Sequence, residues 1–298
     1  MTILLFGKNG QVGRELQRTL LPHGELIALG REEADLADPE TVSQALHEYN
    51  PQIVVNAAAY TAVDKAEQEE EIAQRINGES VEAMARYAKA AGALLVHYST
   101  DYVFDGEKEG AYAPQDKPNP QSAYGRTKLA GENTITESGC SHLIFRTSWV
   151  YSAIGHNFIK TMLRLASEKA ALKVVADQRG APTSAELIAD VTSLSIAAYR
   201  QDMLKTGVYH LVASGQTTWH GLASYAIDRA TAMGWKLNLS SNQIQPIPTS
   251  EFPTPAKRPA NSILDTSTLE RPLNLALPDW RQHVDRMLNQ LANREIAP

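Results

Sequence analysis

A tyrosine and a lysine, Tyr124 and Lys128, lie four residues apart in a segment, residues 123–138, that we expect to be a helix. This spacing places both side chains on one face of the helix. An ammonium group beside a phenol favours the phenolate, so we expect Lys128 to lower the pKa of Tyr124 toward the working pH. Such a tyrosine is suited to general acid catalysis of carbonyl reduction. Thr100, at the end of an apolar strand, could hold the carbonyl through its hydroxyl.

A glycine-rich loop near the start of the chain predicts a binding site for a dinucleotide. Its three glycines, each three residues after the last, follow a short apolar strand and precede an amphipathic helix. Glycines let the backbone approach a pyrophosphate closely, and the N-terminus of the helix then points at it. The spacing is one residue longer at its start than the common dinucleotide fingerprint. The cofactor contacts expected in this loop are Gly7, Gly10, Gln11, Val12 and Gly13.

The end of the second expected strand bears on the choice between NADP and NAD. Sites specific for NAD place an acid there, which holds the ribose hydroxyls. This chain has no acid at that point, and Arg31 could instead pair with a 2′-phosphate. We therefore expect NADPH, with use of NADH left open, and we expect Lys128 to bind the nicotinamide ribose. Further cofactor contacts are expected at Asp35 and Leu36, beside the adenine, and at the small residues Ala57, Ala58 and Ala59.

The elements that position these residues alternate between short apolar runs and amphipathic segments. This alternation predicts an α/β fold with a doubly wound parallel sheet, Rossmann-like, in which ligands bind at the carboxyl ends of the strands. Residues 1–150 plus about 172–213 are expected to form the dinucleotide-binding domain. Residues about 151–171 plus 214–298 are expected to form a smaller substrate-binding lobe. Strands are expected at residues 3–6, 25–29, 51–56, 94–99, 143–147, 172–176 and 207–212, a long helix at 65–91, and a proline-rich irregular loop over a pocket at 246–259.

Composition argues against several other classes of protein. The formal net charge of −6 disfavours non-specific binding to nucleic acid or to an anionic membrane. A single cysteine, Cys140, cannot form an internal disulfide, and we expect it to be a packed thiol. No apolar stretch is long enough to cross a bilayer, and the chain starts without a signal-peptide pattern, so we expect a cytoplasmic location. No histidine or cysteine spacing suggests zinc.

Several motifs are similar to those of the extended short-chain dehydrogenase/reductase family, and longer blocks resemble the branch of that family that reduces dTDP-linked 4-keto sugars. The resemblance spans nearly the whole chain. It implies hydride transfer from NADPH to the 4-keto group of dTDP-4-dehydro-L-rhamnose, which gives dTDP-L-rhamnose. The similar motifs are Gly7–Gly13, Ser99–Gly106 and Tyr124–Lys128, and the longer blocks are Asn56–Glu67, Phe145–Tyr151, Gly180–Thr183 and Pro253–Pro259.

The resemblance also assigns roles to individual residues. The catalytic threonine, tyrosine and lysine of the family correspond to Thr100, Tyr124 and Lys128. Arg258 suits a nucleotide sugar because arginine matches a diphosphate bidentately, and Trp149 could either stack on the sugar or fill the core. The substrate contacts implied in this way are Val63, Thr100, Asp101, Tyr102, Trp149 and Arg258.

A homodimer with a structural Mg²⁺ at the dimer contact is a further implication of the resemblance. Glu15 and Glu186 correspond to two of the acidic ligands. Gln290 stands where another acid is expected, and a neutral amide weakens a site for a hard cation. Surface glutamates without a metal remain an equally good interpretation.

Three alternatives compete with a reductase. A sugar-nucleotide dehydratase places Asp-Glu after the threonine, whereas this chain has Asp101-Tyr102 and lacks that proton carrier. An epimerase keeps its cofactor bound and shows no net oxidation of NADPH. Another branch of the family serves as a regulatory subunit of methionine adenosyltransferase and can keep the same motifs. Such a subunit would turn over no keto sugar and would co-purify with the synthetase.

Overall fold

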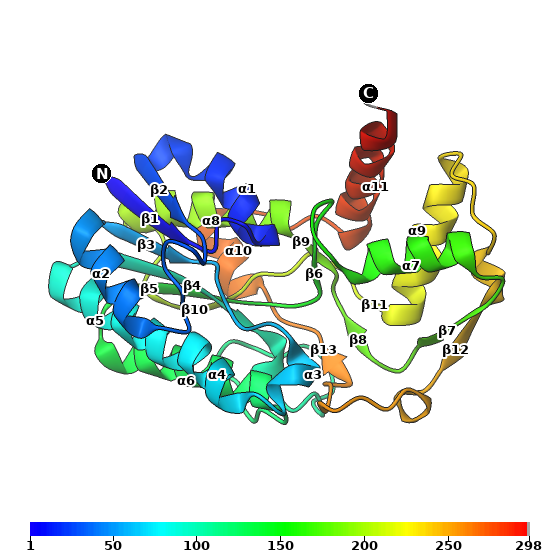
Figure 1. The fold of residues 1–298 in the computed structure, drawn as a ribbon, viewed down its shortest axis with the longest axis horizontal. Coiled ribbons are helices and arrows are strands. Elements are labelled where there is room, and N and C mark those ends of the chain that lie inside the picture. The colour runs from blue at the N-terminus through cyan, green and yellow to red at the C-terminus, as the bar shows by residue number, and fades with distance from the viewer. Residues whose placement is uncertain (297–298) are drawn as a thin grey trace.

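The computed structural model describes residues 1–296, with side chains as far as residue 292, and its larger part is built on a six-stranded parallel sheet (Figure 1). The strand order is β10-β5-β4-β3-β1-β2. This order confirms the predicted doubly wound sheet, because the chain proceeds outward in both directions from β1 and β3. The strands are β1 (Thr2–Phe6), β2 (Glu25–Leu29), β3 (Ile53–Asn56), β4 (Leu94–Thr100), β5 (Ser141–Thr147) and β10 (Gly207–His210).

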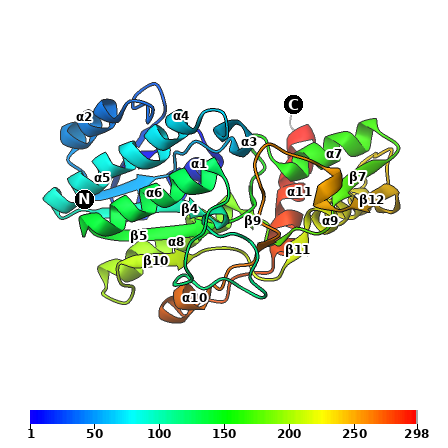
Figure 2. The same cartoon turned by 90° about the horizontal axis from the view of Figure 1, so that it is seen from below.

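Helices cover both faces of this sheet because successive strand residues point in opposite directions (Figure 2). Leu4 and Val54 pack in the cluster that includes α2 and α5, whereas Leu5 and Val55 pack in the cluster that includes α1 and α8. Both sets are fully buried, so the strands read as continuous apolar runs. The covering helices are α1 (Gln11–Thr19), α2 (Pro39–Tyr49), α5 (Ser80–Ala91), α6 (Ala123–Ser138), α8 (Ala185–Arg200) and α10 (Ser267–Leu273).

The smaller part is built from α7, α9 and the paired strands β7 and β12 (Figure 1). The dinucleotide-binding domain was expected to resume at residue 172. In the structure β7 pairs with β12 outside the six-stranded sheet, and the chain returns to that sheet only at β10. The domain boundaries remain predictions, and residues 297–298 lie outside the described residues. These elements are α7 (Phe158–Glu168), β7 (Leu172–Val175), α9 (Trp219–Ala232) and β12 (Ile244–Ile247), and α11 (Trp280–Ile296) contacts α9. Short pairs join the two parts, namely β6 (Val150–Tyr151) with β9 (Thr183–Ser184), and β8 (Arg179–Gly180) with β11 (Thr217–Thr218) and β13 (Asn261–Ser262).

The long helix expected over residues 65–91 is wrong, because the segment is broken. It forms α3 (Val63–Ala66), α4 (Glu70–Gln74), a π-helical turn (Arg75–Glu79) and then α5. Tertiary contacts explain the break. The Glu67 carboxylate accepts a hydrogen bond from the first backbone N–H of α6, and Asn77 bonds to Thr127 of α6. Both interactions draw the segment toward α6 in a way that a straight helix would not allow.

The proline-rich stretch is only partly irregular. Its start, Pro246-Ile247, belongs to β12, where it pairs in parallel with β7. Proline is tolerated there because β12 lies at the edge of a two-stranded pair. The later part runs back toward the large domain and lies against α3 (Figure 1). Within residues 1–296, no helix is long and apolar enough to cross a membrane.

Candidate active site

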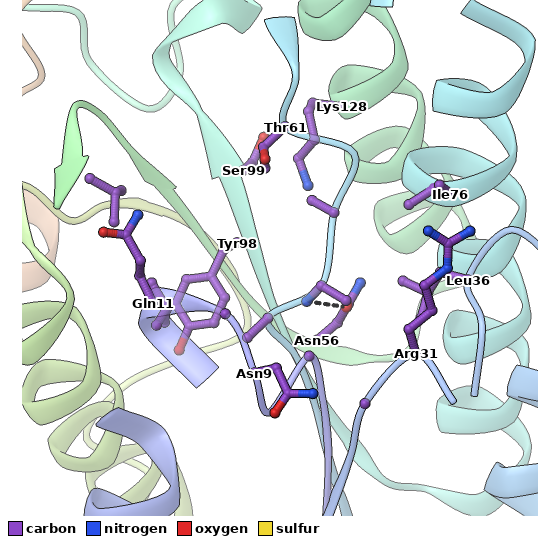
Figure 3. A pocket seen from close by; sticks show the side chains of 18 of the residues that line it. Asn9, Gln11, Arg31, Leu36, Asn56, Thr61, Ile76, Tyr98, Ser99 and Lys128 are labelled. Carbon is purple, nitrogen blue, oxygen red and sulfur yellow. Dashed lines mark hydrogen bonds between the residues drawn. The ribbon is translucent and has the colours of Figure 1, made fainter. Parts of the chain in front are cut away.

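A cavity of about 640 Å³ opens at the carboxyl ends of the strands of the large sheet (Figure 3). Lys128 and Ser99 lie toward one side of it, and Arg31 and Leu36 lie toward another. The cavity brings together nearly all of the cofactor contacts expected from the sequence. Those that line it are Gly7, Gly10, Gln11, Val12, Arg31, Asp35, Leu36, Ala57, Ala58, Ala59, Tyr124 and Lys128.

The glycine loop is shaped by close backbone contacts. Gly7 has φ +88°, and a Cβ there would lie 2.7 Å from the backbone nitrogen of Ala58. A Cβ on Gly13 would lie 2.0 Å from the carbonyl oxygen of Gly7, so Gly13 packs the helix onto the loop rather than lining the cavity. Gly10 is the N-cap of α1 and offers no side-chain cap, so the first N–H groups of the helix are left for a ligand.

Arg31 stands at the rim of the cavity, where the second strand ends. Its guanidinium Nε donates to Asp35 Oδ2 at 3.0 Å, and its side chain is 79% exposed. Another acid near this end, Glu33, pairs with Lys8 and accepts from the backbone N–H of Gly30. Glu33 does not line the cavity. The rim therefore offers a cation whose partner carboxylate, Asp35, also lines the cavity, whereas Glu33 is engaged by Lys8 and Gly30.

Helix α6 delivers Tyr124 and Lys128 to the catalytic end of the cavity. Ser122 caps the helix by accepting from the N–H of Gly125. A Cβ on Gly125 would lie 2.2 Å from the carbonyl oxygen of Tyr102, so glycine allows α6 to approach the chain that follows β4. Close approach of two backbones places Tyr124 beside the strand end that carries Thr100.

Burial dominates the electrostatics of this pair, which differs from the expectation that Lys128 lowers the pKa of Tyr124. Burial raises the pKa of Tyr124 to about 12, an effect partly offset by Thr100. Burial also lowers the pKa of Lys128 to about 8, opposed by Glu132. The ammonium that was expected beside the phenol is itself destabilised, and its Nζ lies 3.1 Å from His97 Nε2. Tyr124 is therefore a protonated phenol at neutral pH, which is the form that donates a proton.

Thr100 and Asp101 form a hydrogen-bonded unit beneath Tyr124. Thr100 Oγ1 donates to Asp101 Oδ1 at 3.0 Å and accepts from the N–H of Tyr102. Ser262, from β13, donates to the other carboxylate oxygen. Burial raises the pKa of Asp101 to about 6, while these donors oppose the shift. Neither Thr100 nor Asp101 lines the cavity. Both act on Tyr124, which does, since Thr100 lowers the pKa of Tyr124 and the charge of Asp101 raises it.

Several expected substrate contacts lie outside the cofactor cavity, close to Tyr102. The rings of Tyr102 and Tyr124 are 5.5 Å apart, edge to face. Arg258 reaches α3, where it donates to Asp64 Oδ2 at 2.8 Å, next to Val63 at the start of that helix. The charge of Arg258 also acts on Tyr102. Val63, Tyr102 and Arg258 thus lie around Tyr124, outside the cofactor cavity.

Trp149 lies at the junction of the two parts. Its ring stacks on Trp219 of α9 with centroids 3.6 Å apart, and it fills the space where a Cβ on Gly180 would be. Its φ of +49° is unusual for a residue with a side chain, so the surrounding structure holds it in place. In this structure the ring packs in the junction, and its contact with a sugar remains a prediction.

Residues that were not expected from the sequence also line the cavity. The hydroxyls of Ser99 and Thr147 are buried and have no hydrogen-bond partner in the part of the chain that the structure describes. Both sit at strand ends, which is the signal that could have identified them, because a buried hydroxyl there needs a ligand. The other additions are Asn9, Gly30, Ala34, Asn56, Thr61, Ile76, Tyr98 and Val150.

Within the described residues of a single chain, the acids considered for Mg²⁺ are not gathered into a metal site. Glu15 and Glu186 face each other from α1 and α8. Burial is the largest cause that raises the pKa of Glu15, and the charge of Glu186 is the second. The Glu186 carboxylate is already bonded to Arg286 Nε and Gln290 Nε2, each at 2.6 Å. Hydrogen bonds and charge, with His283 first, lower the pKa of Glu186 to about 2. Among the described residues, no three histidine, cysteine or acidic side chains converge, so a guanidinium and an amide take the place expected for a cation. Cys140 is a buried free thiol.

Comparison with known proteins agrees with this geometry. The family model described as RmlD substrate binding domain matches residues 1–293. A dTDP-4-dehydrorhamnose reductase of Shigella flexneri is 50% identical over 295 residues, covering 98% of each chain. A crystal structure of a dTDP-4-dehydrorhamnose reductase from Clostridium acetobutylicum superposes with a TM-score of 0.89 at 36% identity, covering 98% of this chain and 100% of that one. The enzyme of the same name from Bacillus anthracis, solved in complex with NADP, gives 0.85 at 34% identity, covering 97% and 99%. The chain therefore belongs to the dTDP-4-dehydrorhamnose reductase family.

Proposed function

We propose that this protein reduces the 4-keto group of dTDP-4-dehydro-L-rhamnose to the alcohol, with NADPH as the hydride donor and dTDP-L-rhamnose as the product. The observation that carries the proposal is the position of Tyr124, a partly buried and protonated phenol that lines a dinucleotide-sized cavity at the strand ends. Relatives over the full chain share the name of this reaction. No observation favours the epimerase or the regulatory subunit.

Different residues along the cavity are expected to bind different parts of the cofactor. The bound cofactor supplies the hydride. The glycine loop and the open N-terminus of α1 would hold its pyrophosphate, and Lys128 would hold the nicotinamide ribose. The unpartnered hydroxyls of Ser99 and Thr147 supply polar contacts deeper in the cavity.

Proton transfer follows from Tyr124 and Thr100. Tyr124 donates its proton to the oxygen of the former ketone, because an alkoxide is a stronger base than a phenolate. The Thr100 hydroxyl has one proton, and in this structure it donates it in a hydrogen bond to Asp101. To hold the ketone, the Thr100 hydroxyl must turn toward the substrate while Asp101 keeps its bond from Ser262. Arg258 is the group suited to the substrate diphosphate.

NADPH rather than NADH is part of the proposal. Arg31 lines the cavity at its rim, and the nearby acid Glu33 is engaged by Lys8. The Bacillus anthracis relative was solved with NADP. A homodimer and a cytoplasmic location also remain proposals, and light scattering on the purified protein tests the first of them.

The decisive experiment follows NADPH absorbance with dTDP-4-dehydro-L-rhamnose. We expect stoichiometric oxidation by the native protein and a loss of kcat of roughly a hundredfold or more in Tyr124→Phe, as for the removal of a general acid. Tyr87→Phe is the matched control, because Tyr87 bonds to Asn50 and Pro51 far from the cavity. Absence of oxidation by folded protein that still binds NADPH would overturn the substrate assignment. Oxidation that survives in Tyr124→Phe would show that another group donates the proton.

A further inference from the structure

A row of buried polar side chains lies behind the catalytic lysine, and the mechanism above gives two of them no role. Lys128 Nζ lies 3.1 Å from His97 Nε2, and His97 Nδ1 lies 3.2 Å from Asn56 Nδ2. Asn56 Oδ1 in turn accepts from the backbone N–H of Ala58 at 3.1 Å (Figure 3). The three side chains are at most 1% exposed, so each has to find its hydrogen-bond partners within the protein.

The direction of every bond in this row follows from Ala58. A backbone N–H can only donate, so the Asn56 atom that faces it is the amide oxygen. The amide nitrogen of Asn56 therefore faces His97, and because that nitrogen can only donate, His97 Nδ1 accepts. A neutral imidazole has one bare nitrogen and one N–H, so the proton of His97 is on Nε2. This N–H points at Lys128 Nζ, which can accept it only as an uncharged amine.

His97 itself stays neutral. It is fully buried, and burial together with the neighbouring Lys128 lowers the pKa of His97 well below its ordinary value. A charged imidazole would carry a proton on both nitrogens and would meet the Asn56 amide with two donors facing each other. The row therefore has a single consistent arrangement of protons as long as Ala58 holds the Asn56 oxygen.

We propose that His97 is a positioning residue that holds Lys128 as a neutral amine in the cofactor-free protein, and that Asn56 selects the tautomer of His97 that does so. Burial acts in the same direction, because it lowers the pKa of Lys128 to about 8. The N–H of His97 Nε2, which an ammonium cannot accept, has to lower the pKa further for the neutral amine to prevail at neutral pH. Glu132 opposes it from the same helix, but that carboxylate is paired with Arg146 of β5 at 2.6 Å. Tyr124 is protonated, and Asp101 at the end of β4 is bonded to Ser262.

The consequence for catalysis rests on the proposed reductase function. Lys128 stabilises a phenolate at Tyr124 only once it has gained a proton. As long as its Nζ stays against His97 Nε2, this protonation requires the Asn56 amide to turn away from Ala58. Ala58 lines the cavity where the cofactor is expected. The protonation state of Lys128 is therefore coupled, through His97 and Asn56, to the backbone at Ala58, which the cofactor is expected to contact. The tautomer of His97 does not depend on the proposed function and is measured without substrate.

The first test is ¹⁵N NMR of the cofactor-free protein labelled at histidine, at neutral pH. The signals of His97 are identified by their loss in His97→Asn. We expect a proton on Nε2 and none on Nδ1. A proton on Nδ1, or on both nitrogens, would overturn the proposal. This measurement needs no active enzyme, so its outcome is separate from that of the NADPH assay.

The second test reverses the tautomer with Asn56→Asp. A carboxylate accepts from both Ala58 and His97, so the proton should move to Nδ1, and Nε2 should then accept from a charged Lys128. We expect the Lys128 titration midpoint, followed with ¹³C at Cε, to rise by about one pH unit or more, which is tenfold in the ratio of ammonium to amine.

Asn77→Asp is the matched control for added charge. Asn77 is as buried as Asn56 but bonds to Thr127 and Tyr60 rather than to His97. Its replacement should leave the proton of His97 on Nε2. The role assigned to Asn56 would be contradicted if Asn56→Asp left the tautomer of His97 unchanged. It would also be contradicted if Asn56→Asp and Asn77→Asp both reversed that tautomer. Thermal unfolding of each variant establishes that the comparison is made between folded proteins.

Discussion

The two ends of the cavity handle charge in different ways. At the catalytic end, Lys128 and Asp101 are removed from water and Tyr124 is partly buried, and burial is the largest cause of each pKa shift. At the rim, Arg31 and Glu33 are exposed, and hydrogen bonds to Lys8 lead the shift in the pKa of Glu33. Desolvation changes which protonation state is present, whereas exposed ion pairs are screened and adjust affinity only modestly. Proton chemistry and cofactor choice are thus placed in different dielectric surroundings.

The largest effect on stability is expected in the glycine loop, at Gly13, where the backbone leaves no room for a side chain. In Gly13→Ala the new Cβ would meet the Gly7 carbonyl at 2.0 Å, so the loop or the helix must move. We expect a loss of about 3 kcal/mol in the free energy of unfolding. A displacement of the loop by about 1 Å should weaken NADPH binding roughly a hundredfold. Urea unfolding and NADPH fluorescence titration measure the two effects.

Gly10→Ala is the comparison for that variant. A Cβ on Gly10 has its nearest neighbour, the Gly7 carbonyl oxygen, at 3.4 Å, so the fold should lose little stability. Equal destabilisation by the two substitutions would show that the loop is not held by the close contact of Gly13 with Gly7.

The next effect is a pH dependence at the catalytic end. Burial raises the pKa of Asp101 to about 6 from 3.8, so the folded protein binds this proton more tightly than the unfolded chain does. Ionised Asp101 therefore opposes folding fully above pH 6, and the cost disappears as the pH falls through 6 toward 3.8. The shift corresponds to about 3 kcal/mol. Asp101→Asn should remove this contribution, which is read from urea unfolding at pH 5 and pH 7.5.

Glu33→Gln sharpens the contrast with the rim. The pKa of Glu33 is lowered, chiefly by its bond from Lys8, so its ionised form stabilises the fold above the pKa of the unfolded chain, and the stabilisation is lost as the pH falls. Because the group is exposed, we expect the pH dependence of unfolding to change little. A larger change from Glu33→Gln than from Asp101→Asn would contradict the division between a desolvated end and a screened rim.

The smallest effect is expected at the rim itself. Arg31→Ala should raise the KM for NADPH about threefold to tenfold and leave the KM for NADH unchanged, because an exposed arginine contributes about a kcal/mol to phosphate binding. Arg164→Ala is the control, since Arg164 forms the same i, i+4 type of exposed pair with Glu168 on α7. Equal changes in the KM for both cofactors would remove Arg31 as the determinant of specificity.

The local parts of the site could be predicted from the sequence because short spacings determine them. Tyr124 and Lys128 share a helix face by periodicity, and the glycine loop follows a strand whose end must lie at the ligand edge of the sheet. Thr100 is placed by the same rule. The order of strands and helices was sufficient to fix the parallel sheet.

The rest depends on contacts between distant segments. His97 lies in an apolar strand, and its partners are 41 residues before it and 31 after it, so its role follows only from the register of β3 with β4. Ser262 meets Asp101 from 161 residues away. The expected lowering of the pKa of Tyr124 by Lys128 is not the leading effect in the cofactor-free protein, because spacing gives proximity but not burial.

The ion pair between Arg258 and Asp64 bears on how fast the protein could cycle. In the proposed function, a substrate diphosphate has to compete with the Asp64 carboxylate for the same guanidinium. This competition weakens the binding of substrate. It weakens the binding of product as well, because the Asp64 carboxylate can pair with Arg258 again as the diphosphate dissociates. Asp64 would then shorten the residence time of the product, which matters because substrate and product carry the same diphosphate and differ only at one carbon of the sugar.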